Sequence, residues 1–416
     1  MTYNLLSYRT DFAQCNGSTN NPNTKDAALA AVVQYEYPHI LMCQEVGSQP
    51  VNADRLLTNA LNVNGVSRWE KADYSNNGFS NLVNMLFFDK TVFGLHSQSY
   101  VQRDLQNQNL TRVIDFYRLY YKDPLLGQGN PDWADTVYLT VIVAHLKAGS
   151  TTADEQERGR ATAAVVDYLN AHVNDQYMII GGDFNARSSN ETAVQNLLNN
   201  SVSSKRFYDP ANALGNWNSS PLFARYHSQS TRNTGNTNNG CFSGGGLDDR
   251  FDFIFTSQEV LNNPSAKIKY VNNSYTVLGN DGLHLNKGIK DAPANTSVPS
   301  TVLDALHNLS DHLPVSMAID IQKLGLNTTE LMLPVKQLFV ANPVRDNLEV
   351  RFVGRRSSLL KWRILDVSGR ELHKASQQVK AGETGQIVMA FGHKPGLYFL
   401  QFEADGVVHT QKLIKL

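Results

Sequence analysis

Apolar runs alternate with polar segments through the first three quarters of the chain. Several short runs predict buried strands: Thr2–Tyr8, His39–Val46, Asn81–Phe88, Val137–His145, Tyr177–Gly181, Phe251–Phe255 and Leu313–Ile321. Longer segments predict helices at Asp26–Tyr37, Val51–Leu61 and Glu155–His172. Residues 201–247 and Gly282–His307 show neither pattern, and loops of such length are usually functional or disordered. We expect the first domain to end with the last of these strands.

The remainder of the chain has a different pattern. Lys323–Met332 is typical of a linker, and short alternating strands separated by turn residues follow it. The predicted strands are Leu348–Phe352, Leu360–Leu365, Gly385–Ala390, Leu397–Phe402 and His409–Ile414. We therefore expect a first domain at residues 1–322, a linker at 323–336 and a small C-terminal β-sandwich at 337–416.

Charge changes along the chain in a similar way. Residues 1–332 hold 24 Lys and Arg against 31 Asp and Glu, whereas residues 333–416 hold 13 against 7. The acidic first domain argues against tight nonspecific binding of nucleic acid through a basic surface. It does not exclude an enzyme that meets phosphate through a bound metal. No apolar run approaches the roughly 18 residues of a membrane-spanning helix.

The cysteines leave the cellular compartment open. Cys15, Cys43 and Cys241 are too few for a disulfide framework, and they lack the spacing of a zinc site. They allow one bridge, whose pairing the sequence does not reveal. No signal-peptide pattern precedes the first strand, so we expect that Met1 is not the natural start if the protein is exported.

Polar and ionisable residues stand at or near the ends of the predicted strands. They are Asn4, Glu45, His145, Asp183 with Asn185, Asp252, and Asp311 with His312. A carboxylate in a buried strand is costly unless it is paired or bound to metal. Because the ends of packed strands converge at one edge of a sheet, we expect these side chains to form one site.

The chemistry of the set suits hydrolysis of a phosphate ester. Glu45 offers hard oxygen ligands for Mg²⁺ or Mn²⁺. Asp183 and Asn185 are two residues apart, so in a strand they face the same way and could hold a water molecule or a phosphate oxygen. The set suits zinc poorly, because no cluster of His and Cys has the spacing of zinc ligands.

Two histidines could carry the proton transfers. A carboxylate such as Asp252 could orient the imidazole of His312 and raise its basicity. His145 could then protonate a leaving group or stabilise developing charge. A serine-hydrolase motif and a nucleotide-binding P-loop are both absent from the sequence.

These pieces, in this order, resemble the endonuclease/exonuclease/phosphatase superfamily, which includes deoxyribonuclease I-like nucleases, bacterial sphingomyelinases and inositol-phosphate phosphatases. The matching motifs are YNLLSY at the start, QEV at Gln44–Val46, AHLKAG at Ala144–Gly149, GGDFNA at Gly181–Ala186, RFDFIF at Arg250–Phe255 and SDHLP at Ser310–Pro314. The resemblance implies a four-layer α/β sandwich, in which helices flank two packed β-sheets.

The resemblance also implies a role for each residue. It implies Mg²⁺, Mn²⁺ or Ca²⁺ at Glu45, with support from Asn4 and Asp311. Asp183 and Asn185 would position the phosphate and the water, with Asn4 and His145 also near the phosphate. His312 with Asp252 would supply the base, and His145 the acid or the group that stabilises the transition state.

Two positions depart from relatives in that superfamily. Leu6 stands where abasic-site endonucleases carry an acidic residue, which argues against a repair nuclease. His145 has no evident acidic partner of the kind seen in pancreatic-type deoxyribonucleases, and Asn84 is the nearest polar candidate.

The tail resembles the C-terminal sorting domain of type IX secretion substrates in Bacteroidetes. The matching pieces are NPVRDN at Asn342–Asn347, ILDVSGRE at Ile364–Glu371, GLYF at Gly396–Phe399 and the closing QKLIKL at Gln411–Leu416. The resemblance implies a secreted or cell-surface protein that the type IX machinery recognises. A carbohydrate-binding or adhesin sandwich is the alternative for this tail.

Together these features predict a secreted, monomeric, metal-dependent phosphoesterase, most simply a phosphodiesterase or nuclease that hydrolyses nucleic acid. A sphingomyelinase-like enzyme acting on phospholipid headgroups is an alternative, because fold and catalytic set are shared across substrates. A surface binding protein that has lost catalysis is the other, although every polar residue of the set is present.

Overall fold

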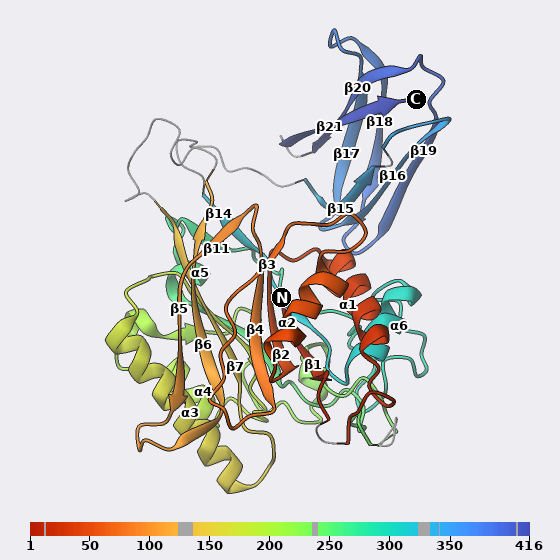
Figure 1. The fold of residues 1–416 in the computed structure, drawn as a ribbon. Helices are drawn as coiled ribbons and strands as arrows, with labels where there is room; N and C mark the ends of the chain where they lie inside the picture. The colour runs from red at the N-terminus through yellow and green to blue at the C-terminus, as the bar shows by residue number, and fades with distance from the viewer. Residues whose placement is uncertain (12–13, 124–135, 235–239, 323–332, 341, 405–406) are drawn as a thin grey trace. The chain divides into compact units, whose positions relative to one another are not determined.

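The computed structural model describes residues 1–416 except 12–13, 124–135, 235–239, 323–332, 341 and 405–406 (Figure 1). Most of the expected linker therefore lies outside the described residues. The chain forms two compact units, of which the larger contains Met1–Val33 and Pro38–Gly325 and the smaller contains Gln34–Tyr37 and Leu326–Leu416. The described residues include no helix long and apolar enough to cross a membrane.

The larger unit contains two six-stranded sheets. The first has the order β12 (Thr276–Val277), β13 (Val315–Ser316), β1 (Thr2–Tyr8), β2 (Ile40–Gly47), β4 (Leu82–Asp89) and β3 (Trp69–Lys71). The second has the order β5 (Phe93–Arg103), β6 (Asn109–Tyr121), β7 (Tyr138–His145), β8 (Met178–Asp183), β10 (Asp252–Ser257) and β9 (Phe207–Tyr208). A separate two-stranded sheet pairs β11 (Ile268–Tyr270) with β14 (Ile319–Ile321).

The two large sheets pack face to face, and helices cover their outer sides (Figure 1). The helices are α1 (Pro22–Glu36), α2 (Pro50–Leu56) with a π-helical turn (Leu57–Leu61), α3 (Thr152–His172), α4 (Thr192–Leu198), α5 (Gln258–Asn262) and α6 (Ser300–Leu309). Single 3-10 turns lie at Ser203–Lys205 and Pro221–Tyr226. The expected four-layer α/β sandwich is thereby confirmed.

The central strands are unbroken apolar runs in the sequence because both of their faces are buried. All residues of β1, β4 and β8 are buried, because each strand has a sheet on one face and helices on the other. Helix α3 begins with a capping box, in which Thr151 and Asp154 satisfy each other's backbone N–H groups. It packs with α4 over the second sheet.

The structure contains one hairpin that the sequence analysis missed, and two sequence-based expectations were wrong in detail. The hairpin of β5 and β6 was not predicted, because much of β5 is exposed and carries few apolar residues. Gly282–His307 was expected to be irregular, yet it contains most of α6, whose apolar residues all lie on one face. The expected strand Leu313–Ile321 is two short strands, β13 and β14, which pair in different sheets.

The smaller unit is a β-sandwich, as expected from its pattern. One sheet has the order β15 (Val335–Val340), β16 (Asn347–Gly354) and β19 (Thr384–Ala390). The other has the order β18 (Glu371–Val379), β17 (Ser358–Leu365), β20 (Gly396–Ala404) and β21 (Val407–Lys415). Alternate residues of β16 and β17 point inward, and both sheets contribute to one apolar core.

Candidate active site

Three neighbouring strands of the second sheet place polar side chains at one edge. Strands β7 and β8 run parallel with His145 beside Asp183, and β10 runs antiparallel with Asp252 opposite Asp183. Gly182 allows this close approach, since a Cβ there would lie 1.8 Å from the carbonyl oxygen of Ala144. The register of the sheet therefore brings three predicted site residues together.

The first sheet contributes Asn4 and Glu45 through an irregular edge. The pairing of β1 with β2 shifts after Asn4, and Leu6, Ser7 and Glu45 all have left-handed backbone angles. Such angles are uncommon outside glycine and re-aim the chain. As a result, the Ser7 N–H donates to Glu45 Oε2 at 2.8 Å, and Asn4 Nδ2 donates to Glu45 Oε1 and Asp183 Oδ2, both at 3.0 Å. Asn4 thus links the two sheets.

The donor atoms gathered there fit a divalent cation. Ligand atoms of Glu45, His145 and Asp183 all lie within 4.8 Å of one another. Burial raises the pKa of Asp183, with Asp252 and Glu45 adding to the effect and His312 opposing it. Carboxylates held this close repel each other unless a positive charge lies between them, and their oxygens are ligands that Mg²⁺ and Mn²⁺ prefer. The cluster is therefore a candidate metal-binding group.

His312 approaches the same oxygen of Asp183 as His145 does. Its Nδ1 is 2.7 Å from Asp252 Oδ2, and its Nε2 is 3.8 Å from Asp183 Oδ2. The hydroxyl of Ser228 also donates to Asp252 Oδ2 at 2.7 Å, and the side-chain amide of Gln229 lies 2.8 Å from His312 Nε2. The pair expected from the sequence is thus in contact, and the outer nitrogen of the imidazole faces the site.

The charges around His312 strengthen its affinity for a proton. Burial alone would lower the pKa of His312, but the charge and hydrogen bond of Asp252, with further charge from Asp183 and Asp311, raise it well above its ordinary value. A carboxylate that bonds one imidazole nitrogen fixes the tautomer and makes the other nitrogen more basic.

His145 has the opposite electrostatic environment. Burial lowers its pKa well below the ordinary value, and the charges of Arg112 and His312 add to this. Its Nε2 lies 3.4 Å from Asp183 Oδ2, while its Nδ1 is buried without a hydrogen-bond partner among the described residues. Asn84 bonds to backbone carbonyls and to another carboxylate instead. His145 is therefore held as a neutral imidazole.

The remaining two predicted residues lie at the ends of loops. Asn185 has a left-handed backbone angle and donates its N–H to Asp183 Oδ1 at 3.0 Å, so it follows the turn after β8. Asp311 accepts the Ser243 N–H on Oδ2 at 3.0 Å, while its Oδ1 is buried without a partner among the described residues. A buried carboxylate oxygen without a partner is costly, which suits an oxygen reserved for a cation.

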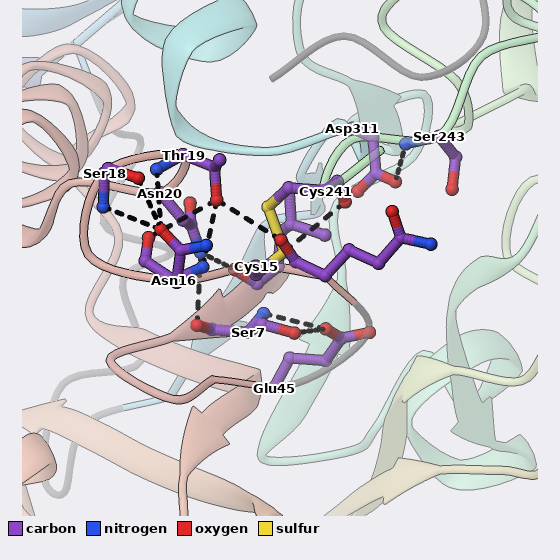
Figure 2. Close-up of a disulfide and its surroundings, with 12 residues drawn as sticks. Ser7, Cys15, Asn16, Ser18, Thr19, Asn20, Glu45, Cys241, Ser243 and Asp311 are labelled. Atoms are coloured by element: carbon purple, nitrogen blue, oxygen red, sulfur yellow. Dashed lines mark hydrogen bonds between the residues drawn. A yellow bond between two sulfur atoms is a disulfide. The ribbon is translucent and has the colours of Figure 1, made fainter. Parts of the chain in front are cut away.

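A disulfide joins Cys15 to Cys241 beside these residues (Figure 2). It connects the loop after β1 to the loop that contains Ser243, while Cys43 is buried and free. Figure 2 shows Asp311 above and Glu45 below the level of the bridge. The disulfide therefore ties together two segments that border the candidate metal site.

The sequence did not single out several residues of the site. Ser228 and Gln229 come from the long loop 201–247, and Arg112 from the unpredicted strand β6. The composition of that loop marked it as functional or disordered without pointing to a residue. Tertiary contacts bring the loop to the site, among them the bridges from Gln229 to Asp249 and to His312.

Comparisons with known proteins agree with this geometry. The model of the endonuclease/exonuclease/phosphatase family matches residues 1–312, and that of the secretion system C-terminal sorting domain matches residues 341–416. The sorting domain indicates export to the surface or the medium. No curated protein matches the chain in sequence.

Solved structures similar to this chain include three with low sequence identity. An endonuclease/exonuclease/phosphatase from Beutenbergia cavernae is 14% identical, covers 99% of this chain and 98% of its own, and has a TM-score of 0.41. D. rerio TDP2 complexed with single strand DNA product is 13% identical, with coverage of 73% and 95% and a TM-score of 0.42. Beta toxin from Staphylococcus aureus is 13% identical, with coverage of 76% and 98% and a TM-score of 0.40. Because the family model spans most of the larger unit, the chain belongs to the endonuclease/exonuclease/phosphatase family.

Proposed function

We propose that the protein is a secreted, divalent-metal-dependent phosphodiesterase that hydrolyses nucleic acid, with catalysis confined to residues 1–322. The observation that carries the proposal is the convergence of two unlike imidazoles on Asp183 Oδ2, at 3.4 Å for His145 and 3.8 Å for His312. Environments that push the pKa values of neighbouring groups apart assign them different roles in proton transfer.

His312 acts as the general base. Asp252 holds its Nδ1, so that Nε2 is the nitrogen able to take a proton from water. The oxygen of that water attacks phosphorus as its proton passes to His312, and the P–O bond to the leaving group breaks. The departing oxygen takes a proton from solvent, and His312 later releases its own proton to solvent. The side-chain amide nitrogen of Gln229 lies 2.8 Å from His312 Nε2, so the water would have to displace Gln229 from the imidazole. A well-placed base contributes about 10²–10⁴-fold to the rate.

His145 stabilises charge on the phosphate. Because its pKa is lowered, it stays neutral at physiological pH, and its Nε2 faces the carboxylates. A neutral imidazole can donate a hydrogen bond from Nε2 to a phosphate oxygen without attracting the carboxylates. This supports the role of stabiliser over that of acid, the two roles expected for His145.

Glu45 would be the principal ligand of the cation. From the sequence, we expect Glu45 to bind metal together with Asn4 and Asp311. In the structure, Glu45 groups with His145 and Asp183. Glu45 is the one residue that belongs to both sets of metal ligands. Asn4 Oδ1 accepts the Leu6 N–H and its Nδ2 faces the carboxylates, which supports a role for Asn4 in orienting Glu45. When bound, the cation neutralises charge that develops on the phosphate.

The choice of a diester, and of nucleic acid, rests on chemistry and location. Cleavage of a diester expels an alkoxide through a transition state with much negative charge, and the neutral imidazole of His145 can donate a hydrogen bond to that charge. Export brings the enzyme to extracellular polymers and lipids, and the exposed loop side chains Phe79 and Leu222 could contact bases. Because the domain is acidic, phosphate recognition would depend on the metal and on His145 rather than on a basic surface.

A substrate panel tests this proposal. Purified protein is compared on plasmid DNA, RNA, sphingomyelin, bis-p-nitrophenyl phosphate and p-nitrophenyl phosphate. We expect faster turnover of the bis ester than of the monoester, and cleavage of at least one nucleic acid. Faster turnover of the monoester would reject a phosphodiesterase, and cleavage of sphingomyelin alone would move the substrate to phospholipid.

Two variants of the protein test the roles assigned to His145 and to Glu45. Mn²⁺ affinity, measured by calorimetry without substrate, should fall for Glu45→Gln and remain near the wild-type value for His145→Ala, although both lose activity. A matching loss of Mn²⁺ affinity in His145→Ala would make His145 a ligand rather than a stabiliser of the phosphate.

A further inference from the structure

Lys25 places a fully buried ammonium group between two segments of the larger unit. The residue lies in α1 and its surface is 1% exposed. Its Nζ donates to the carbonyl oxygens of Leu5 at 2.5 Å, Leu6 at 2.9 Å and Leu309 at 2.5 Å. Three backbone carbonyls thus surround one side-chain nitrogen.

The number of acceptors identifies the charged form. A neutral amine has two N–H donors, whereas an ammonium has three, and only the ammonium can satisfy three carbonyls at once. Burial lowers the pKa of Lys25 to about 7, and the nearby carboxylates of Asp311 and Glu45 act in the opposite direction. The three carbonyls therefore form a binding site for the ammonium of this side chain.

Two of the carbonyls belong to the irregular end of β1. Leu6 and Ser7 are consecutive left-handed residues with φ of 47° and 46°, a conformation that persists only where its surroundings hold it. Asn20 Nδ2 also donates to the carbonyls of Leu6 and Ser7, at 2.8 and 3.1 Å. This segment carries Asn4 and the Ser7 N–H, which both bond to Glu45.

The third carbonyl closes α6. Leu309 is the last residue of that helix, where the final carbonyls lack partners within the helix and carry partial negative charge. The next residues are Ser310, Asp311 and His312. The ammonium therefore fixes the end of the helix from which the base and the Asp311 carboxylate project.

A lysine that only filled the core would not need to connect these segments. Leu5–Leu6 and Leu309 are distant in the sequence. Leu5–Leu6 lies between Asn4 and Ser7, and Leu309 lies two residues before Asp311. We propose that Lys25 is a positioning residue of the metal site, whose ammonium sets the Asn4–Ser7 edge against the Asp311–His312 edge. This inference rests on the proposed function, since it concerns the same site.

The test replaces the ammonium and then returns it. Lys25→Ala removes three methylenes and the nitrogen, a gap that n-propylammonium can fill, whereas Lys25→Met fills the space without charge. Lys205→Ala is the matched control, since Lys205 also donates to backbone carbonyls, those of Val173 and Asp175, away from the site. Mn²⁺ affinity by calorimetry and turnover of bis-p-nitrophenyl phosphate are measured, with circular dichroism to verify folding.

We expect both Lys25 variants to fold and to lose about 10–100-fold in Mn²⁺ affinity and turnover, as when an outer partner of a metal ligand is removed. Added n-propylammonium should restore much of both quantities in Lys25→Ala, but not in Lys25→Met. Tetramethylammonium, which has the charge but no N–H, should restore neither. Lys205→Ala should match the wild type.

Wild-type Mn²⁺ affinity and turnover in both folded Lys25 variants would overturn the inference. Failure of both variants to fold, with n-propylammonium unable to restore Lys25→Ala, would assign Lys25 a purely structural role and would also overturn it. If the wild type binds Mn²⁺ but hydrolyses no phosphodiester, the proposed function fails, while the Mn²⁺ affinities still decide the role of Lys25.

Discussion

Replacing Asp252 with asparagine removes the negative charge beside the proposed base, His312, and changes the shape of the side chain little. Asp252 is fully buried, and its Oδ2 accepts from His312 Nδ1 and from the Ser228 hydroxyl, both at 2.7 Å. Asn has the same shape and keeps an oxygen that can accept from Nδ1. Because Asp252 raises the pKa of His312, its neutral replacement should lower that pKa.

The expected shift follows from the strength of the lost interaction. A hydrogen bond to a charged group is worth about 1.5–3 kcal/mol, and about 1.4 kcal/mol corresponds to one pKa unit. The acidic limb of kcat/KM against pH should therefore move to lower pH by about 1–2 units. The plateau should also fall, by less than in His312→Ala, because the base survives with a poorer orientation.

The assay is hydrolysis of bis-p-nitrophenyl phosphate from acidic to alkaline pH, with samples quenched in alkali before nitrophenolate is read. Ser228→Ala is the control, because it removes a neutral donor from the same Asp252 oxygen. That variant should move the limb only slightly, toward higher pH, since the carboxylate becomes a better acceptor for His312. An acidic limb unchanged in Asp252→Asn, or moved to higher pH, would refute the pairing as the source of basicity.

Four further predictions concern the metal, the fold and the tail. His312→Ala should lower kcat/KM by about 10²–10⁴-fold. A higher Mg²⁺ concentration should partly restore the activity of Glu45→Gln but not that of His312→Ala. If it restores both, Glu45 and His312 do not differ as metal ligand and base. Asp209→Ala leaves the fully buried Arg250 guanidinium without the carboxylate that lies 2.8 Å away, so chemical denaturation should show that the free energy of unfolding falls by about 3–5 kcal/mol. Lys290→Ala, which breaks an exposed ion pair with Asp304, should change the free energy of unfolding little. Reduction of the Cys15–Cys241 bridge, which closes a span of 226 residues, should cost about 2–5 kcal/mol of stability, and a Cys15→Ser, Cys241→Ser double variant should no longer respond to reductant. A protein ending after residue 322 should fold and keep full activity, and an insoluble or inactive product would contradict the two-domain division.

Sequence and structure agree best where chemistry coincides with strand ends. The apolar runs before Glu45, His145 and Asp183 predicted buried strands, and strand ends of packed sheets meet at one edge. Asp252 was recognisable because a carboxylate inside the run RFDFIF is costly without a partner. Local pattern and the cost of burial were therefore enough to find most of the candidate site.

What the sequence could not reveal depends on long-range geometry. The left-handed angle of Glu45, which turns its carboxylate toward Asn4, leaves no mark in a run of apolar residues. The partner of Cys15 lies 226 residues away, and a helical lysine such as Lys25 is ordinarily exposed. The position of Gln229 beside His312 likewise follows only from the path of a long loop.

Hydrolysis of bis-p-nitrophenyl phosphate by purified protein, first in excess EDTA and then after Mg²⁺ or Mn²⁺ is restored, tests the central claim most directly. A site built on Glu45 predicts that activity disappears with EDTA and returns with either cation. Wild-type protein treated in parallel with His312→Ala shows whether the returned activity belongs to this site. Hydrolysis at an unchanged rate in EDTA, or in the absence of the His312 imidazole, would contradict the account.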